Sequence, residues 1–326
     1  MIYISHESMD PFFWFALEYE FLQEREPQDD VFLFWRTEPT LMIGSYQIAA
    51  AEINEAYAKQ RGIHIVRRIT GGGAIYTDPG SWQFSYIKHN RTGAGIQFEE
   101  FVQPVLNGLR AMGIDASMSE RNDLLVNGKK FCGNAQYRRG DRLLHHGSIL
   151  FDTDIEEMVR GLTVDDEKLI TKGVRSVRQR VTNLKEHIKE PMDAVDFRDR
   201  LLEHMLTGDV KRHILSDEQI QSVQETAQQK FKSWDWNYGR SPDFQVVKSK
   251  RLRGGKIEVR MNLEKGLIAD CSIHGDFFFG GDIGAVTSRL KGCPYNEQSI
   301  RAALVTALQG QSFYMIGLDE LVECML

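Results

Sequence analysis

Apolar and polar positions follow two different periods along the first half of the chain. Apolar residues recur at helical spacing over 8–25 and 98–113, which predicts amphipathic helices there. Alternation of apolar and polar residues over 81–89 predicts a half-buried strand. Two short apolar runs, 31–35 and 40–44, flank the polar tetrapeptide RTEP, and this pattern predicts a buried β-hairpin.

Turn and capping residues divide this pattern into elements. Gly62 ends a predicted helix over 53–62, since glycine often closes a helix in the left-handed conformation. The pair Asn127-Gly128 separates two strand-like runs, and this dipeptide is the preferred two-residue hairpin turn. Ser216 opens the sequence SDEQ, a capping-box pattern that predicts the start of another helix.

The order of the elements indicates the fold class. Strands and helices interleave, but the strands come in hairpin pairs, including a second hairpin with its turn at 264–266. This order favours an α+β fold, with mixed, mostly antiparallel sheets flanked by helices, over a doubly wound parallel sheet. Aromatic residues, glycine and proline gather at 234–244, which is typical of a domain boundary. We therefore expect one domain at 1–244 and a small α+β domain at 245–326.

Composition excludes several classes of protein. The chain has 326 residues, 42% of them hydrophobic, and a net charge of −6, whereas a general nucleic-acid binder usually carries a basic excess. The first residues lack the pattern of a signal peptide, and no apolar run reaches the length of a membrane span. The four cysteines form no CxxC pair, so neither a zinc site nor a disulfide framework is indicated. We expect a soluble, cytoplasmic protein.

Three consecutive glycines, Gly71 to Gly73, follow two arginines in the stretch RRITGGGAIYTD at 67–78. The triplet matches neither the dinucleotide fingerprint nor the P-loop, and a plain tight turn is the simplest interpretation. Because side chains alternate along a strand, one of Arg67 and Arg68 should point inward and need an anion there. Backbone N–H groups beside such an arginine form a cradle for phosphate or carboxylate. The alternative for Arg68 is a salt bridge to an acidic side chain.

The hairpin at Asn127-Gly128 carries the second candidate cluster. Lys129 and Lys130 should point to opposite faces, one into solvent and the other towards a cleft. An inward lysine suits phosphate oxygens as a compact positive charge, although most lysines are ordinary surface residues. Asn122 and Asp123 are candidates to hold a Mg²⁺ that arrives with a nucleotide. Their alternative role is a turn at the start of the strand.

His146 and Cys132 are the remaining candidates from the residues alone. His146 precedes a glycine and a strand, where its ring could donate to a ligand, but a lone histidine is more often structural. Cys132 has no neighbour in the sequence that plainly serves as its base, and small buried cysteines are usually inert.

Together, these segments resemble the lipoate-protein ligase A family of the biotin/lipoate ligase superfamily. Five motifs occur in the family's order, which is far more specific than any one of them: RRITGGGAIYTD, NDLLVNGKKFCGNAQY, HHGSILFD, EKLITKGVRSVRQRVTNL and WDWNYGRSPDF. The resemblance covers about 30–245, and the remaining residues have the size of the family's accessory domain.

The resemblance implies a ligase that uses ATP and Mg²⁺ in two steps. The carboxylate of lipoate, or of octanoate, attacks the α-phosphate of ATP, and pyrophosphate leaves. The ε-amine of a lysine on an acceptor protein then attacks the mixed anhydride, and AMP leaves. The acceptors would be lipoyl domains of the E2 subunits of 2-oxoacid dehydrogenases, the glycine-cleavage H protein, or both. We expect a monomer.

The resemblance also implies roles for individual residues. Lys130 would contact the acyl carbonyl and the phosphate and act in both steps. The loop that contains Gly71 to Gly73, called the glycine loop below, would press against the acyl-adenylate. The residues implied around the acyl and phosphate groups are Arg68, Thr70, Gly71, Gly72, Gly73, Asn122, Asp123, Gly133 and Ala135, with Asp123 also as a Mg²⁺ ligand. Those implied by the adenine are Ile75 and Tyr76, and those implied along the lipoyl chain are Trp35, His146 and Ser148.

Two moving parts follow from the resemblance as well. The loop at 174–184 should close over the intermediate, because a mixed anhydride hydrolyses easily. The accessory domain should swing between the half-reactions about the junction near Gly239 and Pro242.

Two positions depart from the family pattern. The family's loop histidine is Thr77 here, and an asparagine is replaced by Ser81. Thr77 does not titrate near neutral pH, so acid–base chemistry is not expected there. The alternative function is an ATP-independent octanoyl or lipoyl transferase that uses a cysteine thioester, with Cys132 nearest the motifs. The C-terminal domain favours the ligase, and Lys130 argues against a non-catalytic lipoate-binding protein.

Overall fold

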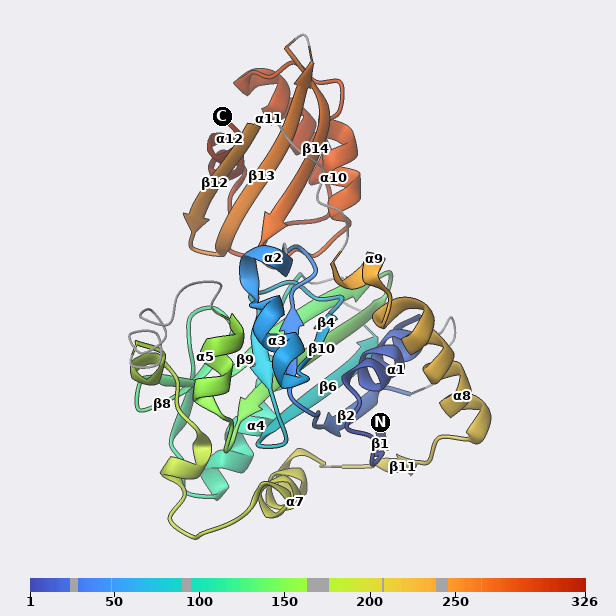
Figure 1. Ribbon diagram of the computed structural model, residues 1–326, viewed down its shortest axis with the longest axis vertical. Coiled ribbons are helices and arrows are strands. Elements are labelled where there is room, and N and C mark those ends of the chain that lie inside the picture. The colour runs from blue at the N-terminus through green and yellow to red at the C-terminus, as the bar shows by residue number, and fades with distance from the viewer. Residues whose placement is uncertain are drawn as a thin grey trace.

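Figure 1 shows the computed structural model of the chain, which describes residues 1–23, 29–47, 49–89, 95–162, 176–206, 208–238, 246–264 and 266–326. A central sheet with helices on both faces forms the larger part. A second, smaller assembly of strands and helices, residues 246–326, lies above it and is called the C-terminal unit below. The predicted α+β class is confirmed. No helix among the described residues is long and apolar enough to cross a membrane.

The central sheet has eight strands and is mostly antiparallel. In spatial order the strands are β11 (Lys211–His213), β1 (Ile2–Ile4), β2 (Val31–Trp35), β6 (Ser81–His89), β10 (Arg142–Leu150), β9 (Lys129–Arg139), β8 (Asp123–Val126) and β7 (Ala116–Met118). Strand β1 pairs in parallel with both of its neighbours, β11 and β2, and the other strands of the sheet pair in antiparallel fashion. The neighbouring long strands β6, β10 and β9 form the middle of the sheet.

A small second sheet lies beside this one and corrects one prediction. It contains β4 (His64–Arg67), β3 (Thr40–Ile43) and β5 (Ile75–Thr77), in that spatial order. The hairpin predicted over 31–44 is therefore wrong, because β2 belongs to the central sheet and β3 to the small one. Every residue of both strands is buried. Such continuous apolar runs lack the alternation that would specify a pairing partner.

Helices cover the two faces of the central sheet. On one face α4 (Glu99–Ala111) and α7 (Ala194–Met205) pack against each other over a core of aromatic side chains. On the other face α1 (Pro11–Gln23) packs against α8 (Asp217–Thr226) and the π-helical turn η2 (Ala227–Phe231). The shorter helices are α2 (Ala49–Glu52), α3 (Glu55–Arg61), α5 (Ile155–Leu162), η1 (Leu184–His187) and α9 (Trp234–Asn237).

The predicted turn and cap residues are confirmed where the structure describes them. Gly62 closes α3 in the left-handed conformation, with φ of 67°. Asn127 and Gly128 have φ of 49° and 74°, which are the positive values that a tight hairpin turn requires. Ser216 caps α8 in a capping box with Gln219.

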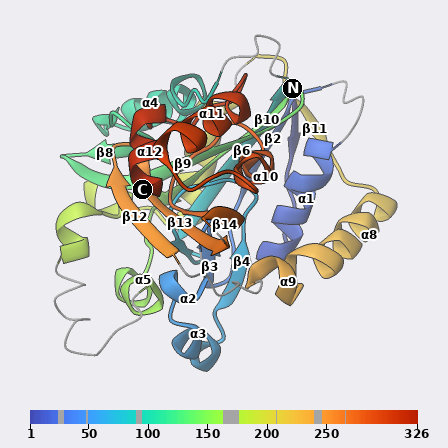
Figure 2. The same ribbon diagram turned by 90° about the horizontal axis from the view of Figure 1, so that it is seen from above.

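The C-terminal unit packs three helices on a three-stranded antiparallel sheet. The strands are β12 (Val246–Leu252), β13 (Gly255–Glu264) and β14 (Leu267–Gly275), and the helices are α10 (Ile283–Leu290), α11 (Glu297–Ala307) and α12 (Leu318–Met325). The predicted hairpin is confirmed as β13 and β14, and β12 lies outside it. Seen from above, the unit projects over the strands of the larger part (Figure 2). The predicted boundary at 244–245 and the junction near Gly239 and Pro242 lie outside the described residues.

Candidate active site

A cavity of about 520 Å³ opens over the face of the central sheet that α1 covers in part. Cross-strand pairing explains its floor, because laterally paired residues present their side chains on the same face. One row of paired residues consists of Trp35, Gln83, Ser148, Gly133 and Asp123. The next row on that face, two residues along each strand, contains Ser85, His146 and Ala135.

The walls of the cavity come from segments that are distant in the sequence. All but two of the residues predicted for the site line it, and the two exceptions are Thr70 and Gly71. Sequence reasoning missed other lining residues, among them Phe15, Met42, Gln83, Asn134 and Phe278. Phe278 belongs to the C-terminal unit, and no local pattern could have assigned it to a site more than a hundred residues away.

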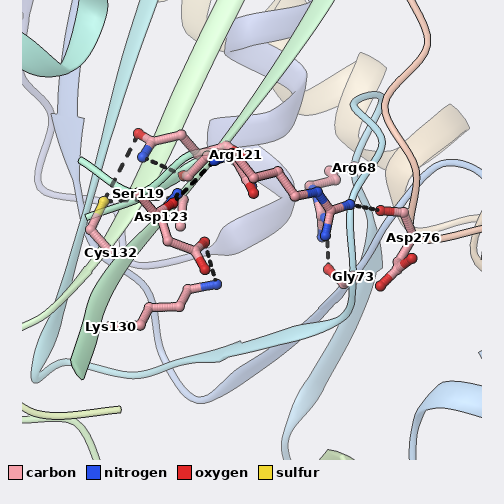
Figure 3. Close-up of polar contacts among 11 residues, drawn as sticks. Arg68, Gly73, Ser119, Arg121, Asp123, Lys130, Cys132 and Asp276 are labelled. Atoms are coloured by element: carbon pink, nitrogen blue, oxygen red, sulfur yellow. Dashed lines mark hydrogen bonds and ion pairs between the residues drawn. The ribbon is translucent and has the colours of Figure 1, made fainter. Parts of the chain in front are cut away.

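Lys130 lies on the cavity side of the β8–β9 hairpin (Figure 3). Its Nζ atom is 2.8 Å from Oδ1 of Asp123, while Lys129 Nζ donates to the backbone carbonyl of Arg178 outside the cavity. The predicted division between the two lysines is thus confirmed. A Cβ atom at Gly133 would lie 3.0 Å from Lys130 Nζ, so the glycine leaves room for the ammonium group. Both members of the pair keep about a third of their side chains exposed, at 35% and 30%.

Arg67 and Arg68 are both buried, which contradicts the expected alternation. Strand β4 ends at Arg67, so the two side chains are no longer held on opposite faces. Arg67 donates to backbone carbonyls of Gly44, Gln47, Trp236 and Asn237, and Arg68 donates to those of Met42, Gly71 and Gly73 and to Thr70 Oγ1.

Backbone carbonyls therefore take the place of the anion that a buried arginine was expected to need. In the described part of the chain, neither arginine forms an ion pair, so the predicted salt bridge of Arg68 is absent there. Burial lowers the pKa of each guanidinium to about 10. Both groups consequently stay protonated at neutral pH.

The glycine loop is pressed from behind by the C-terminal unit. A Cβ atom at Gly71 would lie only 2.3 Å from the carbonyl oxygen of Phe277, and one at Gly72 would lie 3.0 Å from the ring of Phe278. The backbone N–H of Gly72 donates to the same carbonyl at 3.1 Å, and its φ of 96° favours glycine. The close approach that excludes a side chain at Gly71 is thus made by protein, whereas Gly72 and Gly73 also face the cavity.

His146 connects the cavity wall to two groups buried behind it. Its Nε2 atom is 2.7 Å from Thr70 Oγ1, and its Nδ1 atom is 3.2 Å from Oε1 of Glu18. Glu18 has no exposed surface and was not predicted. A signal for it exists in the sequence, because a carboxylate stands at an apolar-face position of the helix 8–25, three residues after Phe15 and four before Leu22.

Cys132 lines the cavity but is 1% exposed. Burial raises the pKa of its thiol well above the ordinary range. The thiol's partners are the carbonyl of Gly133 and the amide oxygen of Asn134, and neither is a base. The group is therefore poorly suited to form a thiolate nucleophile.

The two departures from the family pattern lie away from the cavity lining. Thr77 is fully buried, with Oγ1 2.8 Å from Oγ1 of Thr37. Ser81 Oγ donates to the carbonyl of Asp78 and accepts from its N–H group. Both hydroxyls are thus used in local structure.

Part of the predicted closing segment also reaches the cavity. Residues 174 and 175 lie outside the described residues, but Val177, Arg180 and Val181 line the cavity. The backbone N–H of Thr182 donates to the carbonyl of Lys130 at 2.9 Å. The segment is thereby joined to the strand that carries the lysine.

The donor set in the cavity fits a metal that arrives with a nucleotide. The described residues contain no group of three His, Cys, Asp or Glu side chains that could hold a metal by themselves. Asp123 supplies one carboxylate beside Lys130, and Mg²⁺ commonly uses one or two carboxylates together with phosphate oxygens and water. The amide of Asn122 donates to the carbonyl of Asn134 at 2.7 Å, and it serves the structure of the floor.

Comparison with known proteins agrees with this geometry. The family model for the lipoyl protein ligase A/B catalytic domain matches residues 10–206, and that for the bacterial lipoate protein ligase C-terminus matches 241–325. Lipoate-protein ligase LplJ of Bacillus subtilis is 35% identical over 319 residues, which cover 96% of each chain.

Two solved structures share the fold. LipL1 of P. falciparum, solved in complex with lipoate, has a TM-score of 0.79 and 24% identity and covers 99% of this chain and 98% of its own. A bi-partite lipoate protein ligase of Thermoplasma acidophilum, solved as part of a lipoylation system with its E2 lipoyl domain, has a TM-score of 0.66 and 26% identity. It covers 75% of this chain and 98% of its own. The chain belongs to the lipoyl protein ligase A/B family, as its motifs predict.

Proposed function

We propose that this protein is a lipoate-protein ligase that activates lipoate with ATP and transfers the lipoyl group to a lysine of an acceptor domain. The observation that carries the proposal is the position of Lys130. Its ammonium group lies beside a carboxylate in the cavity that Gly72 and Gly73 also line, in a chain with ligase relatives over nearly its full length.

In the first step the lipoate carboxylate attacks the α-phosphorus of ATP, and pyrophosphate leaves. Negative charge grows on the phosphate oxygens, and Lys130 supplies a positive charge where that growth occurs. Mg²⁺, when bound, would neutralise further phosphate charge, and Asp123 is the residue that fits it. Arg68 acts through the loop, because its guanidinium holds the carbonyls of Gly71 and Gly73.

In the second step the acceptor amine attacks the acyl carbonyl of the adenylate, and AMP leaves. Lys130 again stabilises the charge that develops on oxygen. The apolar side chains of Trp35 and Phe15 suit the acyl chain, and Ile75 and Tyr76 suit the adenine. A walled cavity slows hydrolysis of the mixed anhydride by limiting access of water.

The finer assignments belong to the same proposal. Acceptors are lipoyl domains of E2 subunits, the glycine-cleavage H protein, or both, and the T. acidophilum relative with its E2 lipoyl domain supports the first class. We further propose a catalytic domain at 1–244, an accessory domain at 245–326, a monomeric state and a cytoplasmic location. The thioester route through Cys132 is not favoured, since its buried thiol lacks a base among the described residues.

The test is lipoate-dependent exchange of labelled pyrophosphate into ATP, with purified protein and Mg²⁺ and without acceptor. The wild type should catalyse exchange, and Lys130→Ala should lose it by roughly 100-fold or more, since a transition-state charge is removed. Lys129→Ala is the matched control, because its side chain lies outside the cavity, and it should behave as the wild type. Exchange that is unchanged in Lys130→Ala would refute the assignment of this lysine. No exchange by folded wild type would refute adenylation itself.

A further inference from the structure

Glu18 is a buried carboxylate that the reaction, as described above, does not use. It has no exposed surface, and burying an anion is costly unless hydrogen bonds and charges compensate. Among the described residues, its carboxyl group has hydrogen bonds with the imidazole of His146 and with the hydroxyl of Ser85, which donates to Oε1. A buried carboxyl group with these partners is expected to have a structural role in the site.

The partners found among the described residues favour one direction for the hydrogen-bond chain that ends at Glu18. Arg68 Nε can only donate, so Thr70 Oγ1 accepts from it at 3.1 Å. The single proton of the Thr70 hydroxyl is then free for His146 Nε2, at 2.7 Å. In this direction Nε2 accepts and the imidazole proton is on Nδ1, which faces both carboxylate oxygens of Glu18 at 3.2 and 3.3 Å.

This chain joins the guanidinium of Arg68 to the carboxyl group of Glu18 through the side chains of Thr70 and His146. Glu18 acts to raise the pKa of Arg68, against the lowering by burial and by Arg67. The other end of Arg68 donates to the carbonyl oxygens of Gly71 at 2.9 Å and Gly73 at 2.7 Å. The shape of the glycine loop thus depends on the position in which this hydrogen-bond chain holds the guanidinium of Arg68.

A second donor chain reaches the same carboxylate from the cavity. Trp35 Nε1 donates to Ser85 Oγ at 3.0 Å, and Ser85 donates to Glu18. Trp35 and His146 line the cavity, whereas Thr70 and Glu18 do not. Glu18 therefore fixes two cavity walls and the loop at once, and neither it nor Thr70 is placed to touch a substrate.

We propose that Glu18 and Thr70 are positioning residues for the adenylation step: through His146 they hold Arg68, and Arg68 holds the glycine loop against which the nucleotide reacts. This inference rests on the proposed function, because its kinetic readout is pyrophosphate exchange. It assigns to Thr70 a role behind the site, in place of the direct contact with substrate that the family motif implied.

A pair of near-isosteric variants tests the proposal. Thr70→Val keeps the shape and removes the hydroxyl, and Thr70→Ser keeps the hydroxyl and removes the methyl group. We expect Thr70→Val to lower kcat for exchange by roughly 10- to 100-fold, the size of a hydrogen bond to a charged network. The KM for lipoate should stay within about twofold, because Thr70 does not line the cavity. Thr70→Ser should retain exchange within about twofold of the wild type.

The tautomer of His146 supplies an independent readout. ¹⁵N NMR of the histidine-labelled wild type at neutral pH should show Nδ1 protonated and Nε2 unprotonated, with His146→Gln used to assign the signals. Thermal unfolding of Thr70→Val should match the wild type, which separates positioning from loss of fold.

The results of these measurements separate the positioning role of Thr70 and Glu18 from the proposed function. Full exchange activity in Thr70→Val overturns the proposal, and so does a His146 that carries its proton on Nε2 or is doubly protonated. If Thr70→Val does not fold, the tautomer alone decides. Wild type without exchange, but with the expected tautomer, refutes the proposed function and leaves the hydrogen-bond chain supported.

Discussion

At the scale of single residues, Cys132 separates the ligase from a transferase that uses a thioester. Its thiol lines the cavity, but burial raises its pKa and its neighbours are an amide and a carbonyl. We expect Cys132→Ala to retain both pyrophosphate exchange and transfer to an acceptor within about twofold, because no step uses a thiolate. The small side chain removed should cost only about 1 kcal/mol of stability. Loss of transfer with exchange intact would favour the thioester route.

The same scale shows which site residues the sequence can predict. Lys130 was predictable because strand alternation after a two-residue turn is a local rule, and it requires one of two neighbouring lysines to face inward. The burial of both arginines was not predictable, because it depends on carbonyls of Trp236 and Asn237, about 170 positions along the chain from Arg67. Glu18 and its partner His146 are likewise joined only by the fold.

At the scale of elements, the glycine loop gives a prediction about stability. A methyl group at Gly71 would overlap the carbonyl oxygen of Phe277, a backbone atom that cannot turn aside. Gly71→Ala should therefore lower the free energy of unfolding by roughly 1–3 kcal/mol, as overpacking does in other cores. Gly73→Ala is the control, because its Cβ would lie 3.7 Å from the nearest atom, in ordinary contact. Chemical denaturation measures both, and equal stabilities would contradict the close approach seen here.

Elements also differ in how much local sequence determines them. The β8–β9 hairpin was predictable, because its turn dipeptide and its strands are neighbours. Strands β2 and β3 were recognised as buried but were assigned to each other, since a run without apolar–polar alternation carries no information about its partner. Each pairs instead with strands further along the chain, β6 and β5. Pairings of this kind are set by the whole core.

At the scale of the whole molecule, Arg121 links the C-terminal unit to the site. Its Nη2 atom donates to the carbonyl of Asp276 at 2.8 Å (Figure 3). The same atom donates to the carbonyl of Gly254 at 2.6 Å, and the guanidinium lies 5.3 Å from the centre of the Phe278 ring. Tyr314 donates its hydroxyl to the carbonyl of Arg121. The contact places Phe278 in the wall of the cavity, so release of this link would open that wall.

We expect the C-terminal unit to move between the two half-reactions, and Arg121 to hold it in the arrangement seen here. Arg121→Ala removes partly buried donors from two carbonyls, which should shift the equilibrium towards an undocked unit. Solution scattering of the variant should show a larger radius of gyration than that of the wild type. Arg253→Ala is the matched control, because its pair with Glu120 is exposed and should contribute at most about 1 kcal/mol. Identical scattering profiles for Arg121→Ala and the wild type would show that this arginine does not hold the C-terminal unit. Identical scattering profiles for the free and the adenylate-bound wild type would argue against the movement itself.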